Sequence, residues 1–209
     1  QYTGGTDVAG DSAATITLSA NDGFGDEALG SVNVDILQTE DNSLIVTTEI
    51  DVFDAYDQET SLSEAVDFVN SNEDASIITF DASLDGETVT LAGTELTLTS
   101  DITIDGDIDG DNVADITIDG DNQSRVFNIS SSGIANLDAL TITGGLTNSG
   151  AGISNFGTAT VTNSTLSGNT AEYGAGINNI GNVTVTNSTL RGNPAFVGCL
   201  YYPTHPATA

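Results

Sequence analysis

The chain of 209 residues carries 31 acidic and only two basic residues, which gives a formal charge of −29. With two arginines and no lysine, the chain lacks the cationic side chains that bind the phosphates of nucleic acids. The sequence contains no apolar run long enough to predict a membrane-spanning segment. Repulsion among so many carboxylates is relieved by bound cations or by salt, which favours a secreted or cell-surface protein. Acidity that serves solubility alone is the alternative explanation.

Residues 1–38 contain two segments in which apolar and polar residues alternate, at residues 14–20 and 30–37. Alternation of this kind is typical of β-strands, and an Asn-Asp-Gly turn would join the two. The run DGFG at residues 22–25, followed by VNVDI at residues 32–36, resembles the end of bacterial Ig-like or cadherin-like surface modules. The resemblance implies that this region is a partial module of that kind.

Residues 39–75 contain a linker, a strand candidate at residues 44–50 and the one segment with strong helical signals. Ser61 and Glu64 have the spacing of a capping box, in which each side chain binds the backbone N–H of the other residue. Apolar residues follow at the spacing of one helical face, namely Leu62, Ala65, Val66 and Val69. Because a solenoid exposes its apolar interior at each end, we expect this helix to cover the first coil.

Residues 76–198 contain short alternating segments and an internal repeat. The sequence of residues 150–173 recurs in residues 174–197, and the pentapeptide TNSTL begins at both Thr162 and Thr186. This fixed period, with strand-like alternation and no helical period, predicts an all-β fold, a parallel β-helix with coils of about 24 residues. Further strands are expected at residues 76–80, 88–91, 95–99, 101–104, 115–118 and 125–129.

Equivalent positions of successive coils stack on one another in such a solenoid. The offset predicts three columns: Val161 with Val185, Asn163 with Asn187, and Ile118 with Ile142, Leu166 and Leu190. The aliphatic columns would fill the interior, and the asparagines would form a corner, because Asn tolerates left-handed backbone angles. Residues 199–209 break the pattern, so we predict an irregular tail there.

Several motifs follow one another in a familiar order. They are TSLSEA at residues 60–65, ITFDASLDG from Ile78, SRVFNI from Ser124 and LTITGG from Leu140. The order resembles bacterial and archaeal surface proteins in which a CSLREA cap precedes a pectin-lyase-like β-helix with polymorphic outer-membrane-protein-like repeats. The cap departs from that motif at Thr60 and Ser63, which leaves the capping box intact. The resemblance implies a right-handed β-helix and a surface location, and it implies no reaction.

The densest group of carboxylates lies at residues 105–115, before the second of two DITIDGD sequences. The candidate ligands are the side chains of Asp105, Asp107, Asp109, Asp111 and Asp115 and the carbonyl oxygen of Val113. Carboxylates two residues apart on a turning backbone suit Ca²⁺, which takes six to eight oxygen ligands. A solvated acidic loop without metal is the alternative.

Two registers of a DxDxDGxxD-type calcium loop fit this segment. With Asp107 at position 1, Asp115 falls at position 9 and Asn112 replaces the glycine of position 6, where Asn accepts a left-handed conformation. With Asp105 at position 1, Gly110 keeps the sixth place, but position 9 lacks a carboxylate. No glutamate stands at position 12 of the first register, so the loop is not an EF-hand.

The sequence therefore predicts a non-enzymatic structural or adhesive rod, stabilised by Ca²⁺, that presents its surface to glycans or host cells. Open strand edges at its ends also predict self-association, up to fibres. A polysaccharide lyase or hydrolase is the alternative, because the same fold hosts such enzymes, and Arg125 would be the base of a lyase. A structural Arg125 that neutralises the acidic loop is the competing interpretation of this residue.

Overall fold

The computed structural model describes residues 14–21, 26–34, 44–54, 59–72 and 76–201, which belong to two compact units. In the first unit, β1 (Ala14–Asn21) and β2 (Asp26–Val34) form an antiparallel hairpin. The second strand begins at Asp26 rather than at residue 30, because backbone pairing does not require alternating side chains. The expected turn at residues 22–23 and most of the linker lie outside the described residues.

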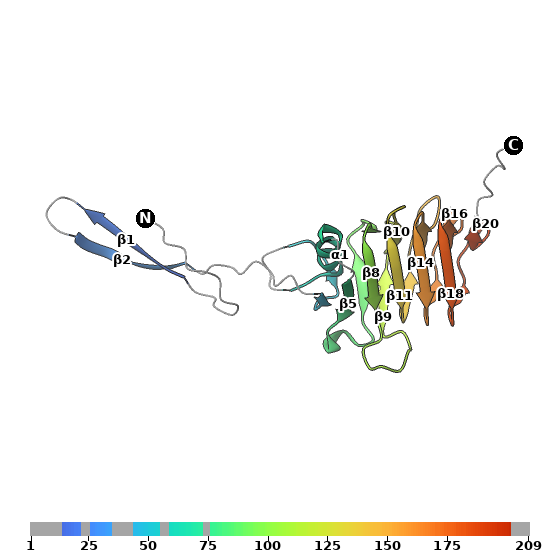
Figure 1. The fold of residues 1–209 in the computed structure, drawn as a ribbon, viewed down its shortest axis with the longest axis horizontal. Coiled ribbons are helices and arrows are strands. Elements are labelled where there is room, and N and C mark those ends of the chain that lie inside the picture. Colours follow the sequence, from blue (N-terminus) through green and yellow to red (C-terminus); the bar gives the residue numbers. More distant parts are fainter. Residues whose placement is uncertain (1–13, 22–25, 35–43, 55–58, 73–75, 202–209) are drawn as a thin grey trace. The chain divides into compact units, whose positions relative to one another are not determined.

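The second unit is a right-handed parallel β-helix built from three parallel sheets, as the sequence predicts (Figure 1). The first sheet contains β3 (Ile45–Val46), β5 (Ser76–Phe80), β8 (Asp101–Asp105), β11 (Ile134–Asp138), β14 (Thr158–Thr162) and β18 (Asn182–Thr186). The second contains β4 (Ile50–Asp51), β6 (Thr88–Leu91), β9 (Ile116–Asp119), β12 (Leu140–Thr143), β15 (Thr165–Ser167) and β19 (Thr189–Arg191). The third contains β7 (Leu96–Leu98), β10 (Phe127–Ile129), β13 (Ile153–Asn155), β17 (Ile177–Asn179) and β21 (Leu200–Tyr201).

Each complete coil passes through the first, second and third sheets in turn. The strands expected at residues 76–80 and 88–91 are confirmed, and the four at 95–129 differ from the observed ones by one or two residues at one or both ends. The strand expected at residues 44–50 is instead two short strands, β3 and β4, because the chain turns from the first sheet to the second between them. A short additional pair, β16 (Ala171–Tyr173) and β20 (Ala195–Val197), follows the second sheet in the last two coils. A single-turn 3₁₀ helix, η1 (Ala82–Leu84), precedes β6.

The interior consists of stacked aliphatic columns. In the second sheet, the column runs through Val89, Ile118, Ile142, Leu166 and Leu190, which contains all four of the positions that the period predicts. Val161 likewise aligns with Val185. The members of both columns before the last coil are fully buried, so each coil completes the core of its neighbour.

Asparagines stack both at the corner and inside the solenoid. Asn163 and Asn187 have φ angles of 52° and 51°, and the Asn187 amide donates to Oδ1 of Asn163 at 3.5 Å, as the corner prediction requires. The period did not lead us to expect buried ladders, yet Nδ2 of Asn169 donates to Oδ1 of Asn193 at 3.0 Å. Such amide pairs satisfy polar groups that burial would otherwise leave unbonded.

The 24-residue period describes the last coils but not every pair of neighbouring strands in the earlier ones. Ile134 aligns with Thr158, and hydrogen-bonded side chains of these coils lie 24 positions apart. In the coil with the Asp-rich segment, Thr103 and Asn136 are neighbours although 33 positions separate them. The additional residues lie in a loop between β8 and β9, so the stacking continues although the sequence period is lost.

Residues 199–201 do not begin an irregular tail. Strand β21 pairs in parallel with β17, and the N–H groups of Gly176 and Ile177 donate to the carbonyl of Cys199 at 2.9 and 3.0 Å. Backbone pairing needs no side-chain repeat, which is why the break in the repeat gave the wrong expectation here. The rest of the predicted tail, residues 202–209, lies outside the described residues.

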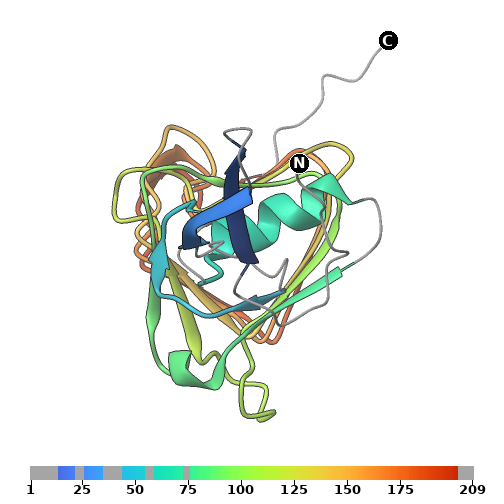
Figure 2. The same cartoon turned by 90° about the vertical axis from the view of Figure 1, so that its left-hand side faces the viewer.

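Helix α1 (Leu62–Ser71) lies across the first end of the coils (Figure 2). Oγ of Ser61 accepts the N–H of Glu64 at 3.3 Å, and the Glu64 carboxylate accepts the N–H of Ser61 at 2.9 Å, so the predicted capping box is formed. All four residues of the predicted apolar face are buried. None of the helices among the described residues is long and apolar enough to cross a membrane.

The end of α1 is bound to the free edge of the third sheet. Nδ2 of Asn70 donates to the Thr97 carbonyl at 2.7 Å, and its Oδ1 accepts the N–H of Thr99 at 2.9 Å. The Asn70 amide thus makes the bonds that a neighbouring strand would make to β7. The helix therefore covers apolar surface and satisfies an open strand edge together.

Replacing Ser61 with Ala should lower the free energy of unfolding by about 1 kcal/mol, because the N–H of Glu64 loses its acceptor. Ser71→Ala, at the exposed last residue of the same helix, is the matched control and should change stability by less than about 0.5 kcal/mol. Urea unfolding of the two variants measures both values. Equal effects would show that the capping box does not hold the helix.

Candidate metal centre

The Asp-rich loop occupies residues 106–115, at the corner between the first and second sheets. The next coil crosses the same corner with Ala139 alone, whereas this loop projects away from the coils between β8 and β9 (Figure 1). At its base, the N–H of Asp115 donates to the Gly106 carbonyl at 3.2 Å. Gly106 has no room for a side chain, because a Cβ there would lie 2.4 Å from the carbonyl oxygen of Ala139. The loop therefore leaves the solenoid at a fixed point.

Three carboxylates converge inside this loop. One oxygen from each of Asp107, Asp109 and Asp115 lies within 4.8 Å of the others. The backbone folds around them, since the two oxygens of Asp107 accept the N–H groups of Gly110 and Asn112 at 2.9 and 3.1 Å. Oδ2 of Asp115 accepts the N–H of Ile108 at 2.8 Å. These bonds hold oxygen atoms together without a cationic side chain among them.

The remaining predicted ligands lie at the edge of this group. Oδ1 of Asp105 accepts the N–H of Asp107 at 3.1 Å, and Oδ1 of Asp111 accepts the N–H of Val113 at 2.7 Å. Neither carboxylate belongs to the converging set. Val113 is exposed in the returning part of the loop.

The arrangement distinguishes the two registers. With Asp107 first, the converging side chains occupy positions 1, 3 and 9, whereas the register that starts at Asp105 places its first ligand outside the group. The backbone angles do not discriminate, because Gly110 and Asn112 both have positive φ, at 84° and 63°. The geometry of the side chains therefore favours the Asp107 register.

The surroundings of Asp109 act on its pKa in opposite directions. The N–H of Asp111 lowers the pKa of Asp109 through a hydrogen bond at 3.0 Å, but desolvation and the charges of Asp111, Asp115 and Asp107 together raise the pKa above its usual value. A divalent cation would remove this repulsion, and carboxylate and carbonyl oxygens are the ligands that Ca²⁺ prefers.

Arg125 does not neutralise the loop, which corrects one of the two interpretations of this residue. Its Nη1 forms an ion pair with Glu95 at 2.5 Å, and its Nε and Nη2 donate to the carbonyls of Gly150 and Ser149, each at 2.9 Å. Glu95 also accepts the amide of Asn128 at 2.8 Å. The guanidinium thus joins the segment before β10 to Glu95, which precedes β7, and to the loop before β13.

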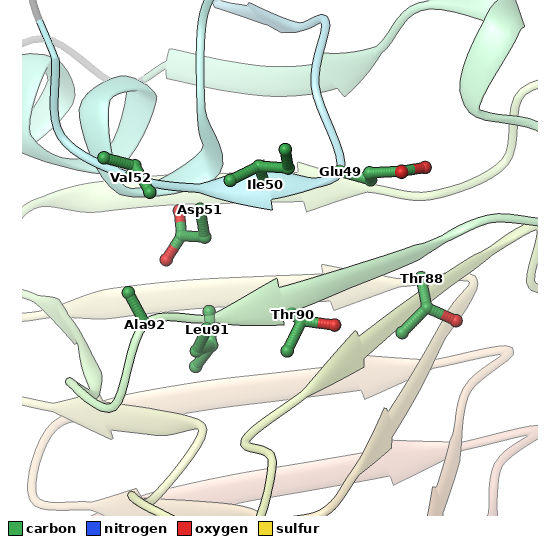
Figure 3. Close-up of a pocket in the computed structure, with 8 residues that line it drawn as sticks. All are labelled: Glu49, Ile50, Asp51, Val52, Thr88, Thr90, Leu91 and Ala92. Carbon is green, nitrogen blue, oxygen red and sulfur yellow. The ribbon is translucent and has the colours of Figure 1, made fainter.

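A shallow pocket of about 360 Å³ lies by the first coil, beside β4 and β6 (Figure 3). Its lining residues are Glu49, Ile50, Asp51, Val52, Thr88, Thr90, Leu91 and Ala92. Figure 3 shows the Asp51 carboxylate on the side of β4 that faces Leu91 and Ala92. This side chain is 3% exposed and accepts both the N–H and the hydroxyl of Ser63, each at 2.7 Å. Asp51 therefore binds the first turn of α1, a role that no sequence signal separates from that of other aspartates.

Comparisons with known proteins do not assign this chain to a family. A scan against protein-family models, a search of curated proteins and a search of solved structures each found no match. The fold assignment therefore rests on the strand pairing described above, and the candidate metal centre rests on the loop geometry alone.

The Asp107 register predicts which carboxylates matter for calcium affinity. Asp115→Asn should weaken Ca²⁺ binding by at least about tenfold, whereas Asp105→Asn should change it by less than about threefold. Titration calorimetry of the two variants, which differ equally from the parent in charge, measures both constants. The opposite order would assign the site to the register that starts at Asp105.

Asp51 and Asp81 should contribute to the pH dependence of stability with opposite signs. Burial raises the pKa of Asp51, against the hydrogen bonds from Ser63 and together with the charge of Glu64. The native state then binds the proton of the Asp51 carboxyl more tightly than the unfolded state does. The stability that this group contributes is therefore lost as pH rises through its folded pKa. In η1, the hydroxyl and the N–H of Ser83 lower the pKa of Asp81. The stability that the Asp81 carboxylate contributes is therefore lost as pH falls through its folded pKa.

Urea unfolding between about pH 2.5 and pH 7 tests both signs, because the unfolded pKa of Asp is about 3.9. Relative to the parent, Asp51→Asn should gain stability as pH rises above about 4, and Asp81→Asn should gain stability as pH falls below about 4. Parallel stability curves for Asp51→Asn and the parent would contradict the account of the buried carboxylate.

Proposed function

We propose that the chain is part of a non-enzymatic extracellular surface protein, an acidic β-helical rod that is stabilised by Ca²⁺ and presents its outer faces to a binding partner. The observation that carries the proposal is the convergence of Asp107, Asp109 and Asp115 in a loop inserted into otherwise short corners. A formal charge of −29 supports it, because a chain with almost no cationic side chains needs external cations to limit repulsion.

Calcium in this loop would act on more than the loop itself. The carbonyl of Asp115 accepts the N–H of Gly86 at 3.0 Å, in the preceding coil. The N–H of Gly106 donates to the Asp138 carbonyl at 3.0 Å, in the following coil. Fixing the two ends of the loop would therefore restrain three consecutive coils. Ligation by Asp107, Asp109, Asp115 and the Val113 carbonyl would leave further positions for water.

The surroundings of Arg125 support a structural function over polysaccharide cleavage. A base must be free to take a proton, and this guanidinium is bonded to a carboxylate and two carbonyls. The motif order that resembles CSLREA-capped, pectin-lyase-like surface proteins supports a cell-surface location, where glycans or host cells are the expected partners. Release of unsaturated uronates from an acidic polysaccharide, seen as new ultraviolet absorbance, would replace this proposal with a lyase.

Thermal unfolding with and without calcium tests the proposal. At a calcium concentration of about 100 times the dissociation constant, the melting temperature should rise by about 5–10 °C over its value in chelator. Asp109→Ala should abolish the rise, and Asp121→Ala, in the neighbouring exposed turn, should keep it. If calcium left the melting temperature unchanged, the Asp-rich loop would be a solvated turn without a calcium site, and the proposal would be wrong.

A further inference from the structure

The two ends of the β-helix are finished differently. At the first end, α1 covers the interior and Asn70 occupies the edge of β7. At the other end, no described helix covers the interior; β18 and β19 are the last described strands of the first and second sheets, as β3 and β4 are the outermost strands of these sheets at the first end. Figure 1 shows β18 as the last large strand of the stack. The sixth coil, residues 182–201, is therefore a template for further strand pairing.

The core of the described coils is also less covered at this end. Val161 is fully buried in the fifth coil, whereas Val185, the next member of its column, is 37% exposed. Leu190 is only partly buried, although Leu166 beneath it is fully covered. The aliphatic columns that reach Val185 and Leu190 thus lie beside the outer edges of β18 and β19, a combination that is typical of an interface.

The charge of the chain is distributed unevenly along the solenoid. Beyond Asp138, Glu172 is the only acidic residue among the described residues. In the sixth coil, Arg191 is the only charged residue. The other carboxylates of the described solenoid lie at or before Asp138. Two copies that met at their sixth coils would therefore bring together nearly neutral surfaces and keep their acidic coils far apart.

We propose that the sixth coil is a homodimer interface, at which a second copy docks end to end about a two-fold axis. A two-fold axis perpendicular to the solenoid makes facing strands run in opposite directions, so β18 can pair antiparallel with β18 of the second copy. The open side of Val185 would pack against the same column of the partner. The fibre expected from the sequence would require a second uncovered apolar end, and at the first end α1 covers the interior while Asn70 occupies the edge of β7. The dimer does not depend on calcium binding.

Sedimentation velocity over a concentration series up to about 100 µM tests the proposal. The chain should approach a dimer and grow no further. Val185→Lys should weaken dimerisation at least about tenfold, because each added ammonium meets its own copy across the axis. Thr160→Lys, which adds the same charge on the outer face of the fifth coil, should leave the dimer constant within about twofold.

Circular dichroism of each variant establishes that the coils remain folded. If Val185→Lys unfolds, Val185→Thr takes its place, since it keeps a β-branched side chain and should weaken the dimer several-fold. A monomer at every concentration would overturn the proposal, and so would open-ended growth into fibres. If the folded Val185 variants dimerised as strongly as the parent, the dimer interface would lie elsewhere on the chain.

Discussion

The fold depends on the pairing of each coil with the next. The column from Val89 to Leu190 has one residue per coil, so no coil contains a core of its own. The same holds for polar groups, because the amide of Asn169 is bonded to Asn193 of the following coil. Stability is therefore a sum over contacts between neighbours, and whatever happens at one coil is felt by the coils beside it.

This dependence makes the ends and the insertion the informative places. At one end, α1 replaces the missing neighbour with an apolar face and with the amide of Asn70. At the corner between β8 and β9, an inserted loop gathers three carboxylates while its base is bonded to the coils on either side. The base of the loop is thus part of the hydrogen bonding between coils. We infer that a bound cation is what makes so acidic a solenoid compatible with regular coils.

Much of this architecture could be predicted because repetition reveals contacts. Two nearly identical repeats align Val161 with Val185 and Asn163 with Asn187, and the capping box of α1 is a local pattern that needs no knowledge of the fold. Contacts that cross loops of irregular length could not be predicted. Arg125 meets Glu95 30 positions away, and only the coil geometry brings them together. The sequence also offered five aspartates for the metal centre, and the choice among them depends on how the loop turns.

Amide hydrogen exchange with and without calcium tests the central claim most directly, because it reports each segment separately. If calcium holds the loop and the loop holds the coils, addition of Ca²⁺ should slow exchange in residues 107–115. It should also slow exchange at Gly86 and in β8 and β9, while the hairpin β1–β2 stays unchanged. Protection confined to the loop would show that the solenoid is stable without the cation. No protection anywhere would contradict calcium binding itself.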